Sequence, residues 1–378
     1  MNAFTYQYPV TVYFGEGTAA KNLPSELAKV GGTVMLAYGG GSIKKYGIYD
    51  ELIEILKIAG KEIVEFSGIM SNPTYAKVQE GAALAREKHV DFILAVGGGS
   101  VIDCCKIISA QALLDEDIWE LEYAKHGAPT AFIPMGAIVT AFGTGAEMNN
   151  GAVITNEDKM QKAALWGAFA SFAALDPVYT MTMPMKQVIS GSFDTLSHCM
   201  ETYFGMGGAN NLSDEINETI MKSVIRHIRE TVKDPADKYA RSELIWASAM
   251  AENGILKIGK VTDFQCHMIE HQLGAYTDCN HGQGLAVIHP VLYRHIYKSA
   301  PERFARFAKN VWGKNTAEEG VDALADFIKE IGLPTTFSEM NIPTDTDFRA
   351  IAQSTVITPG CCKRLTADEI YEILTECQ

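Results

Sequence analysis

The stretch Leu94-Ala95-Val96-Gly97-Gly98-Gly99-Ser100-Val101-Ile102-Asp103 leads from an apolar run through three glycines into a helical pattern. Such a run, begun at Asp91, is typical of a strand buried in a parallel sheet. Glycines between a strand and a helix let an anion approach the backbone, where the helix offers N–H groups and its positive dipole end. Ser100 and Asp103 are spaced as an N-cap and its capping-box-like partner. The stretch indicates either a pyrophosphate-binding turn or a tight turn with a good cap.

The same device occurs earlier, at Leu36-Ala37-Tyr38-Gly39-Gly40-Gly41-Ser42, and the surrounding chain alternates strands with helices. Strands are predicted at 33–38, 61–66 and 91–96, and helices from about 48 to a stop at Gly60, at 76–88 and through Ser109. This alternation predicts a parallel sheet covered on both faces. Beyond about 180 the pattern changes to successive helices, expected at 185–204, 212–232, 238–257, 261–274, 299–312, 316–331 and 367–377. We therefore expect an α/β dinucleotide-binding domain at 1–180 and an all-helical domain at 181–378.

Composition and charge limit the class of protein. Among 378 residues, 47% are hydrophobic and 21% charged, as in globular proteins, and the net charge of −14 argues against nucleic-acid or anionic-membrane partners. The first residues show no basic region followed by an apolar one, so we expect no secretory signal, and the apolar segment 163–175 is too short to span a bilayer. Eight cysteines without metal or disulfide spacing suit reduced thiols, so a cytoplasmic protein is expected.

The first glycine turn bears on which dinucleotide is bound. An NAD site typically has an acidic residue at a strand end for the ribose 2′-hydroxyl. Here Gly39, Gly40, Gly41 and Ser42 stand at that place, and Lys44 and Lys45 follow. Two lysines suit a 2′-phosphate, although they could also be ordinary solvated helix residues. The sequence favours NADP(H), with NAD(H) as the alternative.

Histidines and carboxylates gather in the second half of the chain. Five of nine histidines fall in the stretch from His267 to His295. Asp194 and His198 are four residues apart on a predicted helix, as are His267 and His271, so each pair shares a helix face. His281 is expected in a loop, where glycines on its C-terminal side permit an unusual backbone course. A carboxylate with two or three imidazoles suits Fe²⁺ or Zn²⁺, whereas a lone interior histidine is more often a satisfied core residue.

Taken together, these stretches resemble the iron-containing (group III) alcohol dehydrogenases, in the butanol dehydrogenase or NADPH-dependent aldehyde reductase branch. The resemblance covers nearly the whole chain and is specific as a set. It rests on GGGSVID (97–103), GTGAEMN (143–149), FDTLSH (193–198), and HMIEH (267–271) followed by NHG (280–282). Ala146 departs from it, because the family usually has serine there, which puts a minor hydrogen bond in doubt.

The resemblance implies a dehydroquinate-synthase-like fold with the active site in the cleft between the two domains. It implies the metal ligands Asp194, His198, His267 and His281, and it places His271 unligated near the nicotinamide. Asp194, His267 and His271 are thus the candidate catalytic residues, with His271 either a proton relay or a polar filler. The implied cofactor contacts are Gly39, Gly40, Gly41, Ser42, Gly97, Gly98, Gly99, Ser100, Asp103, Thr140, Thr144, Asn149 and Lys162.

The implied reaction is hydride transfer between NADP(H) and a small aliphatic alcohol or aldehyde, in a homodimer. One divalent ion, Fe²⁺ foremost and otherwise Zn²⁺ or Ni²⁺, would act as a Lewis acid. Three alternatives stay open: an NAD- and metal-dependent lyase of the dehydroquinate synthase kind, an NAD(H)-preferring polyol dehydrogenase, and a non-enzymatic sensor. The lyase chemistry needs several basic residues near the metal, whereas Phe193, Leu196, Met268 and Leu273 are apolar.

Overall fold

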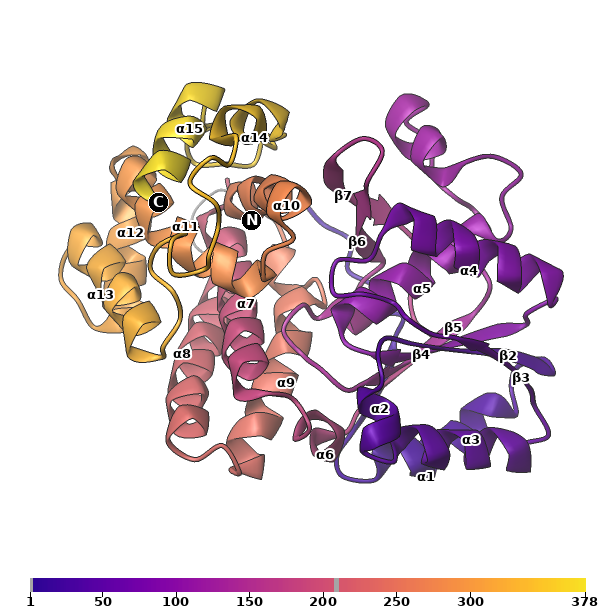
Figure 1. Cartoon of the computed structure of the whole chain (residues 1–378). Coiled ribbons are helices and arrows are strands. Elements are labelled where there is room, and N and C mark those ends of the chain that lie inside the picture. The colour runs from indigo at the N-terminus through magenta and orange to yellow at the C-terminus, as the bar shows by residue number, and fades with distance from the viewer. Residues whose placement is uncertain (1–2, 207–210) are drawn as a thin grey trace. The chain divides into compact units, whose positions relative to one another are not determined.

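The computed structural model describes residues 3–206 and 211–378, and the chain divides into two compact units (Figure 1). Tyr8–Pro184 form the first unit, and the chain from Met185 to Gln378 forms the second together with the N-terminal segment through Gln7. The first unit is α/β and the second is helical. The predicted combination of fold classes is thus confirmed, and each unit is described below by itself.

A six-stranded parallel sheet forms the centre of the α/β unit, in the order β1-β8-β5-β4-β2-β3. Its inner strands are buried along their length, as expected of a parallel sheet with both faces covered. An antiparallel hairpin, β6–β7, lies outside this sheet and was not predicted. The strands are β1 (Thr11–Phe14), β2 (Thr33–Tyr38), β3 (Glu62–Phe66), β4 (Phe92–Gly97), β5 (Met135–Val139), β6 (Gly151–Asn156), β7 (Gln161–Trp166) and β8 (Phe172–Leu175).

Helices cover both faces of this sheet (Figure 1). On one face, Leu23 and Leu52 pack against Leu94 of β4 in a continuous apolar core. The two glycine-rich turns follow β2 and β4, so both lie at the carboxyl edge of the sheet, where α/β proteins bind ligands. The helical segments are α1 (Thr18–Leu27), α2 (Ser42–Lys45), α3 (Ile48–Ile58), α4 (Tyr75–Glu87), α5 (Gly99–Gln111), η1 (Glu120–Ala124), η2 (Ala146–Met148) and α6 (Pro177–Thr180).

The second unit is a bundle in which α8 packs against α7 and α9, and α10 packs against α11. Helix α7 has the predicted bounds, whereas α11 and α14 were not predicted. Glycines and Pro290 interrupt the apolar pattern of α11 and made it resemble a loop. The helical segments are α7 (Met185–Phe204), α8 (Leu212–Lys233), α9 (Lys238–Glu252), η3 (Ile255–Lys257), α10 (Gln265–Thr277), α11 (His281–Ile296), η4 (Tyr297–Ser299), α12 (Pro301–Phe307), η5 (Ala308–Trp312), α13 (Ala317–Glu330), α14 (Phe348–Ser354) and α15 (Ala367–Glu376).

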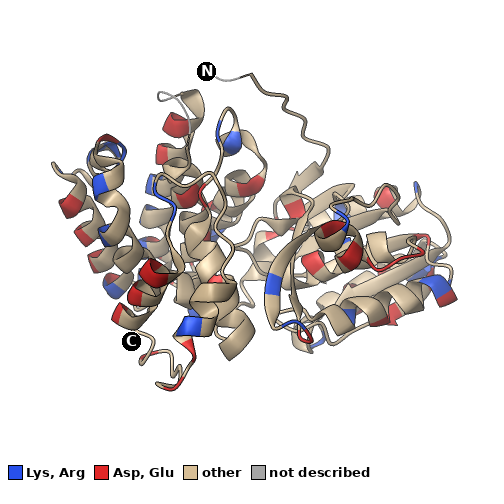
Figure 2. Cartoon of the chain, turned by 90° about the horizontal axis from the view of Figure 1, so that it is seen from above, with Lys and Arg blue, Asp and Glu red and all other residues tan. Residues whose placement is uncertain are grey.

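Charged residues are spread over both units. Acidic and basic segments alternate along the helices in Figure 2, which fits a surface of mixed sign that is acidic in sum. Within the described part of the chain, no helix has the length and apolar character needed to cross a membrane.

Candidate metal centre and nucleotide site

Helix α7 supplies three polar side chains on one face. Asp194, His198 and Glu201 follow one another at four and three residues, the spacing that places side chains along one side of a helix. All three are at most 8% exposed. Charged and titratable groups at such depth are costly unless they are paired or hold a metal, so this face of α7 has a purpose beyond packing.

Two further helices bring imidazoles to this face. His267 lies in the first turn of α10, and His281 is the first residue of α11. The expected loop at His281 is wrong: Gly282 and Gly284 are helical, and neither has a positive φ. Gly282 serves close packing instead, because a Cβ there would lie 2.2 Å from the carbonyl oxygen of Ser190 in α7. This contact sets the start of α11 directly against α7.

Of the four predicted ligands, the three imidazoles converge on one carboxylate oxygen of the fourth, Asp194. From Asp194 Oδ1, the Nε2 atoms lie 3.4 Å away in His267, 3.5 Å in His281 and 3.9 Å in His198. These distances are too long for hydrogen bonds. Ligand atoms held about 2.1 Å from one ion at tetrahedral angles stand roughly 3.4 Å apart. Asp194, His267 and His281 have ligand atoms that all lie within 4.8 Å of one another. His198 is outside this set, although its Nε2 lies 3.9 Å from Asp194 Oδ1.

The buried polar atoms of the cluster also fit a cation. Asp194 Oδ1 and His267 Nε2 are buried and have no hydrogen-bond partner among the described residues. Leaving such atoms unsatisfied costs about 1–3 kcal/mol each. One carboxylate and three imidazoles are nitrogen and oxygen donors that suit Fe²⁺, Zn²⁺ or Ni²⁺. The residues present therefore fit a divalent metal ion.

Two buried glutamates, which sequence reasoning missed, orient two of the imidazoles. Glu201 pairs with Nδ1 of His267, and Glu270 pairs with Nδ1 of His281. Each pairing places the ring proton on Nδ1 and turns the lone pair of Nε2 toward Asp194, as carboxylate partners of metal-bound histidines do. Their sequence signal was the position of each glutamate three residues from a histidine on the same helix: Glu201 after His198, and Glu270 after His267.

Glu201 has a second role at the start of α10. Its carboxylate accepts the backbone N–H groups of Cys266 (2.6 Å) and His267 (3.2 Å). These are N–H groups of the first helical turn, which a carboxylate stabilises. Phe264, just before the helix, has a positive φ of 55°, a conformation that costs a non-glycine residue about 1–3 kcal/mol. Glu201 therefore joins α7, the start of α10 and the His267 ring at one point.

Without a bound ion, the surroundings of Asp194 and His198 favour the protonation states that bind a metal, whereas those of His267 favour the protonated ring, which loses a proton when an ion binds. Burial raises the pKa of Asp194, but the imidazoles of His198, His281 and His267 outweigh it and hold this pKa below its ordinary value. Burial lowers the pKa of His198, and Asp194 only partly offsets the effect. For His267 burial also lowers the pKa, but the Glu201 and Asp194 carboxylates reverse the shift and raise it. An ionised carboxylate and a neutral imidazole are the forms that bind a cation.

His271 lies beside the His267 and His281 rings. Its ring centre is 6.0 Å from that of His267 and 5.5 Å from that of His281. Together with Glu270 and His281 it forms a second set of potential ligands. That set fits a metal less well, because the Glu270 carboxylate already pairs with Nδ1 of His281.

At the other candidate site, the turn after β4 leads directly into α5. The N-cap is Gly98, with no side-chain cap hydrogen bond. The predicted cap is therefore wrong: the Ser100 hydroxyl donates to the carbonyl of Ser71, and Asp103 accepts the N–H of Val153 (2.9 Å). Without a side-chain cap, this helix N-terminus is suited to an anion.

The other predicted cofactor contacts gather around this turn. The N–H of Thr140 donates to Gly97 (2.9 Å), and a Cβ on Gly99 would lie 2.3 Å from the Thr144 hydroxyl. Lys162 donates to Asn72 (3.1 Å), in the loop that Ser100 also contacts. Asp103 and Asn149 both accept hydrogen bonds from Lys106, at 3.2 Å and 3.0 Å. These residues therefore share one edge of the sheet.

Near the first glycine turn, where the sequence pointed only to lysines, the structure also places an acidic residue, Glu65. The Gly40 and Gly41 positions have open space around them, as an approaching ligand requires. Lys44 lies over the Tyr49 ring (4.4 Å) with its ammonium 3.8 Å from Glu65. No acidic residue stands in the turn itself, but Glu65 on β3 reaches the lysine from the neighbouring strand.

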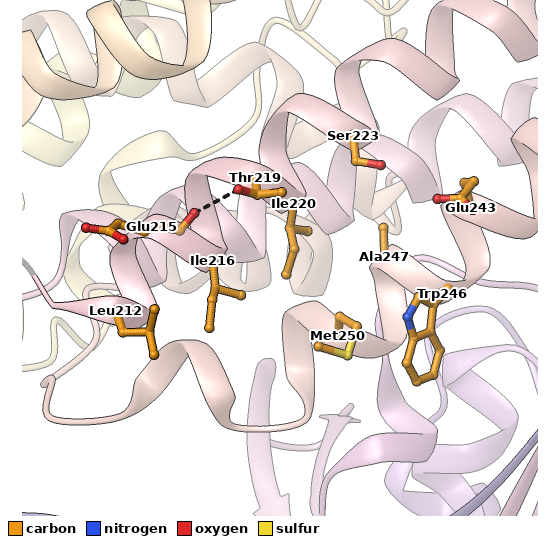
Figure 3. A pocket seen from close by; sticks show the side chains of 10 residues that line it. All are labelled: Leu212, Glu215, Ile216, Thr219, Ile220, Ser223, Glu243, Trp246, Ala247 and Met250. Atoms are coloured by element: carbon orange, nitrogen blue, oxygen red, sulfur yellow. Dashed lines mark hydrogen bonds between the residues drawn. The ribbon is translucent and has the colours of Figure 1, made fainter.

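A separate hollow of about 460 Å³ lies between α8 and α9 (Figure 3). Leu212, Ile216 and Ile220 of α8 line it opposite Trp246 and Met250 of α9. None of the predicted metal or nucleotide residues takes part. This hollow is therefore not the candidate active site.

Comparisons with known proteins show the family to which the chain belongs. A family model described as iron-containing alcohol dehydrogenase matches residues 9–177, and one for the C-terminal part of the Fe-containing alcohol dehydrogenase family matches 188–377. The chain is 37% identical to the probable NADH-dependent butanol dehydrogenase 1 of Bacillus subtilis, over 99% of each chain. It is 34% identical to the NADPH-dependent aldehyde reductase YqhD of Escherichia coli, over 90% of each.

Solved structures give the same result. The NADH-dependent butanol dehydrogenase A of Thermotoga maritima superposes with a TM-score of 0.94 at 32% identity, covering 100% of this chain and 99% of that one. Butanol dehydrogenases and an aldehyde reductase are thus its relatives across both units. The chain belongs to the iron-containing alcohol dehydrogenase family and is an oxidoreductase of the alcohol dehydrogenase type.

Proposed function

We propose that the protein reduces small aliphatic aldehydes, and oxidises the corresponding alcohols, with NADP(H) and one divalent metal ion. The observation that carries this proposal is the convergence of three Nε2 atoms on one buried oxygen of Asp194, at 3.4–3.9 Å. Asp194, His198, His267 and His281 are the proposed ligands. Fe²⁺ is the proposed ion, because the family typically uses iron, with Zn²⁺ or Ni²⁺ as alternatives.

When bound, the ion polarises the oxygen of the substrate and the nicotinamide carries the hydride. The residues of the chain hold the reacting groups and set their charge. Among the four proposed ligands Asp194 alone carries a negative charge, which offsets half of the charge of a divalent ion. Glu201 and Glu270 hold the His267 and His281 rings with Nε2 directed inward.

His271 is the proposed proton relay, because it is a neighbour of two ligand rings and a neutral imidazole can exchange protons near pH 7. We expect His271→Ala to lower kcat about 100-fold, at the low end for proton transfer because water can substitute. Metal content should stay unchanged by elemental analysis, and added imidazole should restore part of the turnover. Loss of metal from this variant would instead make His271 a ligand.

The choice between NADP(H) and NAD(H) is proposed from the first glycine turn. The turn holds no carboxylate, and Lys44 lies two residues beyond Ser42, which supports recognition of a 2′-phosphate. The relatives are named for both cofactors, so the preference of this chain depends on local charge. The Glu65 carboxylate, 3.8 Å from the Lys44 ammonium, offsets its charge. It should therefore weaken the preference for NADP(H) over NAD(H).

We expect Lys44→Met to lower the ratio of kcat/KM for NADPH over NADH about fivefold, since a phosphate near pH 7 carries nearly two charges and an exposed pair contributes up to about 1 kcal/mol. Glu65→Gln should raise the ratio about threefold, by removing the opposing charge. Because both cofactors are measured on one variant, effects on folding and metal loading cancel. An unchanged ratio in both variants would remove the basis for NADP(H).

The deciding experiment couples elemental analysis of the purified protein to assays with butanal and other aldehydes, using NADPH and NADH in turn. Steady consumption of NADPH with butanal supports the proposal. A protein that binds nucleotide and metal but turns over no aldehyde would contradict it. We also propose that the protein is cytoplasmic, because all eight cysteines are free thiols, which suits a reducing compartment. We further propose that it is a homodimer, which light scattering would test.

A further inference from the structure

Lys106, on α5, is a fully buried lysine in the α/β unit, with an exposed fraction of 0%. A buried ammonium is tolerated only where acceptors replace its water. Three acceptors surround it: the carbonyl oxygen of Gly151 at 2.6 Å, Asn149 Oδ1 at 3.0 Å and Asp103 Oδ1 at 3.2 Å. The ammonium can donate three hydrogen bonds, so these contacts match its capacity.

The three acceptors come from separate parts of the nucleotide edge. Asp103 stands one turn earlier on α5, Asn149 directly follows η2, and Gly151 begins β6. The other oxygen of Asp103 accepts the N–H of Val153 (2.9 Å). One lysine therefore joins α5 to the start of the β6–β7 hairpin.

The backbone closes over this lysine from a further side. A Cβ on Gly167, just after β7, would lie 2.5 Å from the carbonyl oxygen of Lys106. The chain just after the hairpin therefore packs against the backbone of α5 at the base of this side chain. Removing the charge would leave Asn149 and Asp103 without their common donor at a position where Lys106 is 0% exposed.

The contact to Asn149 has a direct chemical consequence. Because Lys106 donates to Oδ1, the amide is held with its oxygen toward the ammonium and its nitrogen turned away. An amide nitrogen donates, whereas the oxygen only accepts. Anionic groups such as phosphates need donors, so the orientation of this amide decides whether Asn149 attracts or repels them.

We propose that Lys106 is a positioning residue for nucleotide binding, which holds Asn149 and Asp103 in a fixed orientation at the N-terminus of α5. This inference rests on the proposed nucleotide site. Lys106 itself is buried beneath that site and acts through the two residues it contacts. Its effect should appear in the affinity for nucleotide and not in the binding of metal, whose proposed ligands all lie on α7, α10 and α11.

The test measures the Kd for NADPH, by fluorescence titration of the full-length, metal-loaded protein. Lys106→Met keeps a similar length without the charge, and should weaken binding roughly 10- to 100-fold, as expected for hydrogen bonds to a charged group. Metal content should equal that of the unsubstituted protein. Binding as tight as in the unsubstituted protein would overturn the inference.

A double-mutant cycle tests the route of the effect. If Lys106 acts through Asn149, adding Asn149→Ala to Lys106→Met should weaken binding less than about threefold further, because coupled residues are non-additive. Fully additive losses would overturn the inference.

The variant Asn149→Asp tests the inference if Lys106→Met does not fold. The aspartate keeps an oxygen that accepts from Lys106, but it replaces the amide nitrogen, which donates, by a negatively charged oxygen. This variant should bind NADPH at least about tenfold more weakly with an unchanged or higher Tm, and unweakened binding would count against the inference.

Lys260 provides a matched control. It is a buried lysine of the helical unit that pairs with Asp214, so Lys260→Met should lower Tm without changing the Kd for NADPH. An equal loss of NADPH affinity in this variant would mean that Lys106→Met reports general destabilisation, and would overturn the inference. If the unsubstituted protein binds neither NADPH nor NADH, the proposed function fails first, a result distinct from normal binding by Lys106→Met.

Discussion

Replacing Asp194 with alanine is expected to leave the protein without a bound divalent ion and to lower kcat about 10³-fold or more. Asp194 is the only carboxylate among the four proposed ligands, and its Oδ1 is the atom on which the three imidazoles converge. Without it, three neutral rings would face a dication with no compensating charge. A metal ion that polarises a carbonyl contributes several kcal/mol to the transition state, and about 4 kcal/mol corresponds to three orders of magnitude.

The measurement is metal content by elemental analysis, together with turnover of butanal. Asp176→Ala is the matched control, because Asp176 is a buried aspartate (1% exposed) that caps α6 in the other unit. It should cost about 1 kcal/mol of stability, as helix caps do, and leave metal content unchanged. Full activity of Asp194→Ala after exhaustive chelation would end the proposal of a metal-dependent reaction.

Much of the fold could be predicted because the local sequence patterns favour the same helices and strands that the folded protein contains. Strand β2 and helix α7 have the predicted bounds, since an uninterrupted apolar run and a sustained helical period each leave one interpretation. Helix α11 was missed for the opposite reason. Gly282 and Gly284 signal a turn when read alone, yet in the structure they provide room for Ser190 of α7 and for the side chain of Glu270.

The residues of the candidate site also fall into those that local sequence spacing predicts and those that it does not. The spacing of Asp194 and His198 places both on one helix face, so the sequence could bring them together without knowledge of the fold. The partnership of Glu201 with His267 joins residues 66 positions apart, and no local pattern encodes it. Lys106 looked like any helical lysine, because its burial depends on a hairpin that follows it by more than forty residues. What sequence reasoning missed is the layer of residues that orients the site.

Glu201 and Glu270 belong to this orienting layer, and their substitution should strongly affect metal binding. Glu270→Gln is expected to weaken binding of the divalent ion about 10- to 100-fold, as loss of a carboxylate partner of a metal-bound histidine does. The glutamine keeps the size of the side chain and can still accept the Nδ1 proton of His281. It removes the negative charge that makes the ring a stronger donor, so the effect isolates charge from shape.

Glu201→Gln should weaken metal binding by a similar factor and should also destabilise the metal-free protein more than Glu270→Gln does. Glu201 accepts two backbone N–H groups at the start of α10, and the positive end of a helix dipole favours a full negative charge. Glu270 contacts the side chains of His281, through Nδ1, and of Cys279, through Sγ (3.7 Å). Thermal unfolding of the metal-free variants, beside calorimetric titration with Zn²⁺ or Co²⁺, separates the two effects.

Glu218→Gln serves as the control for both variants. Glu218 is a buried glutamate (5% exposed) on α8 that accepts hydrogen bonds from Tyr203 (2.8 Å) and Asn310 (2.9 Å) and pairs with Arg306. Its loss should lower Tm without changing the Kd for the ion. If all three variants lost metal affinity equally, the effect would reflect loosening of the bundle as a whole. A specific loss with Glu201 and Glu270 alone would mean that these carboxylates set the affinity of the site through the rings they hold.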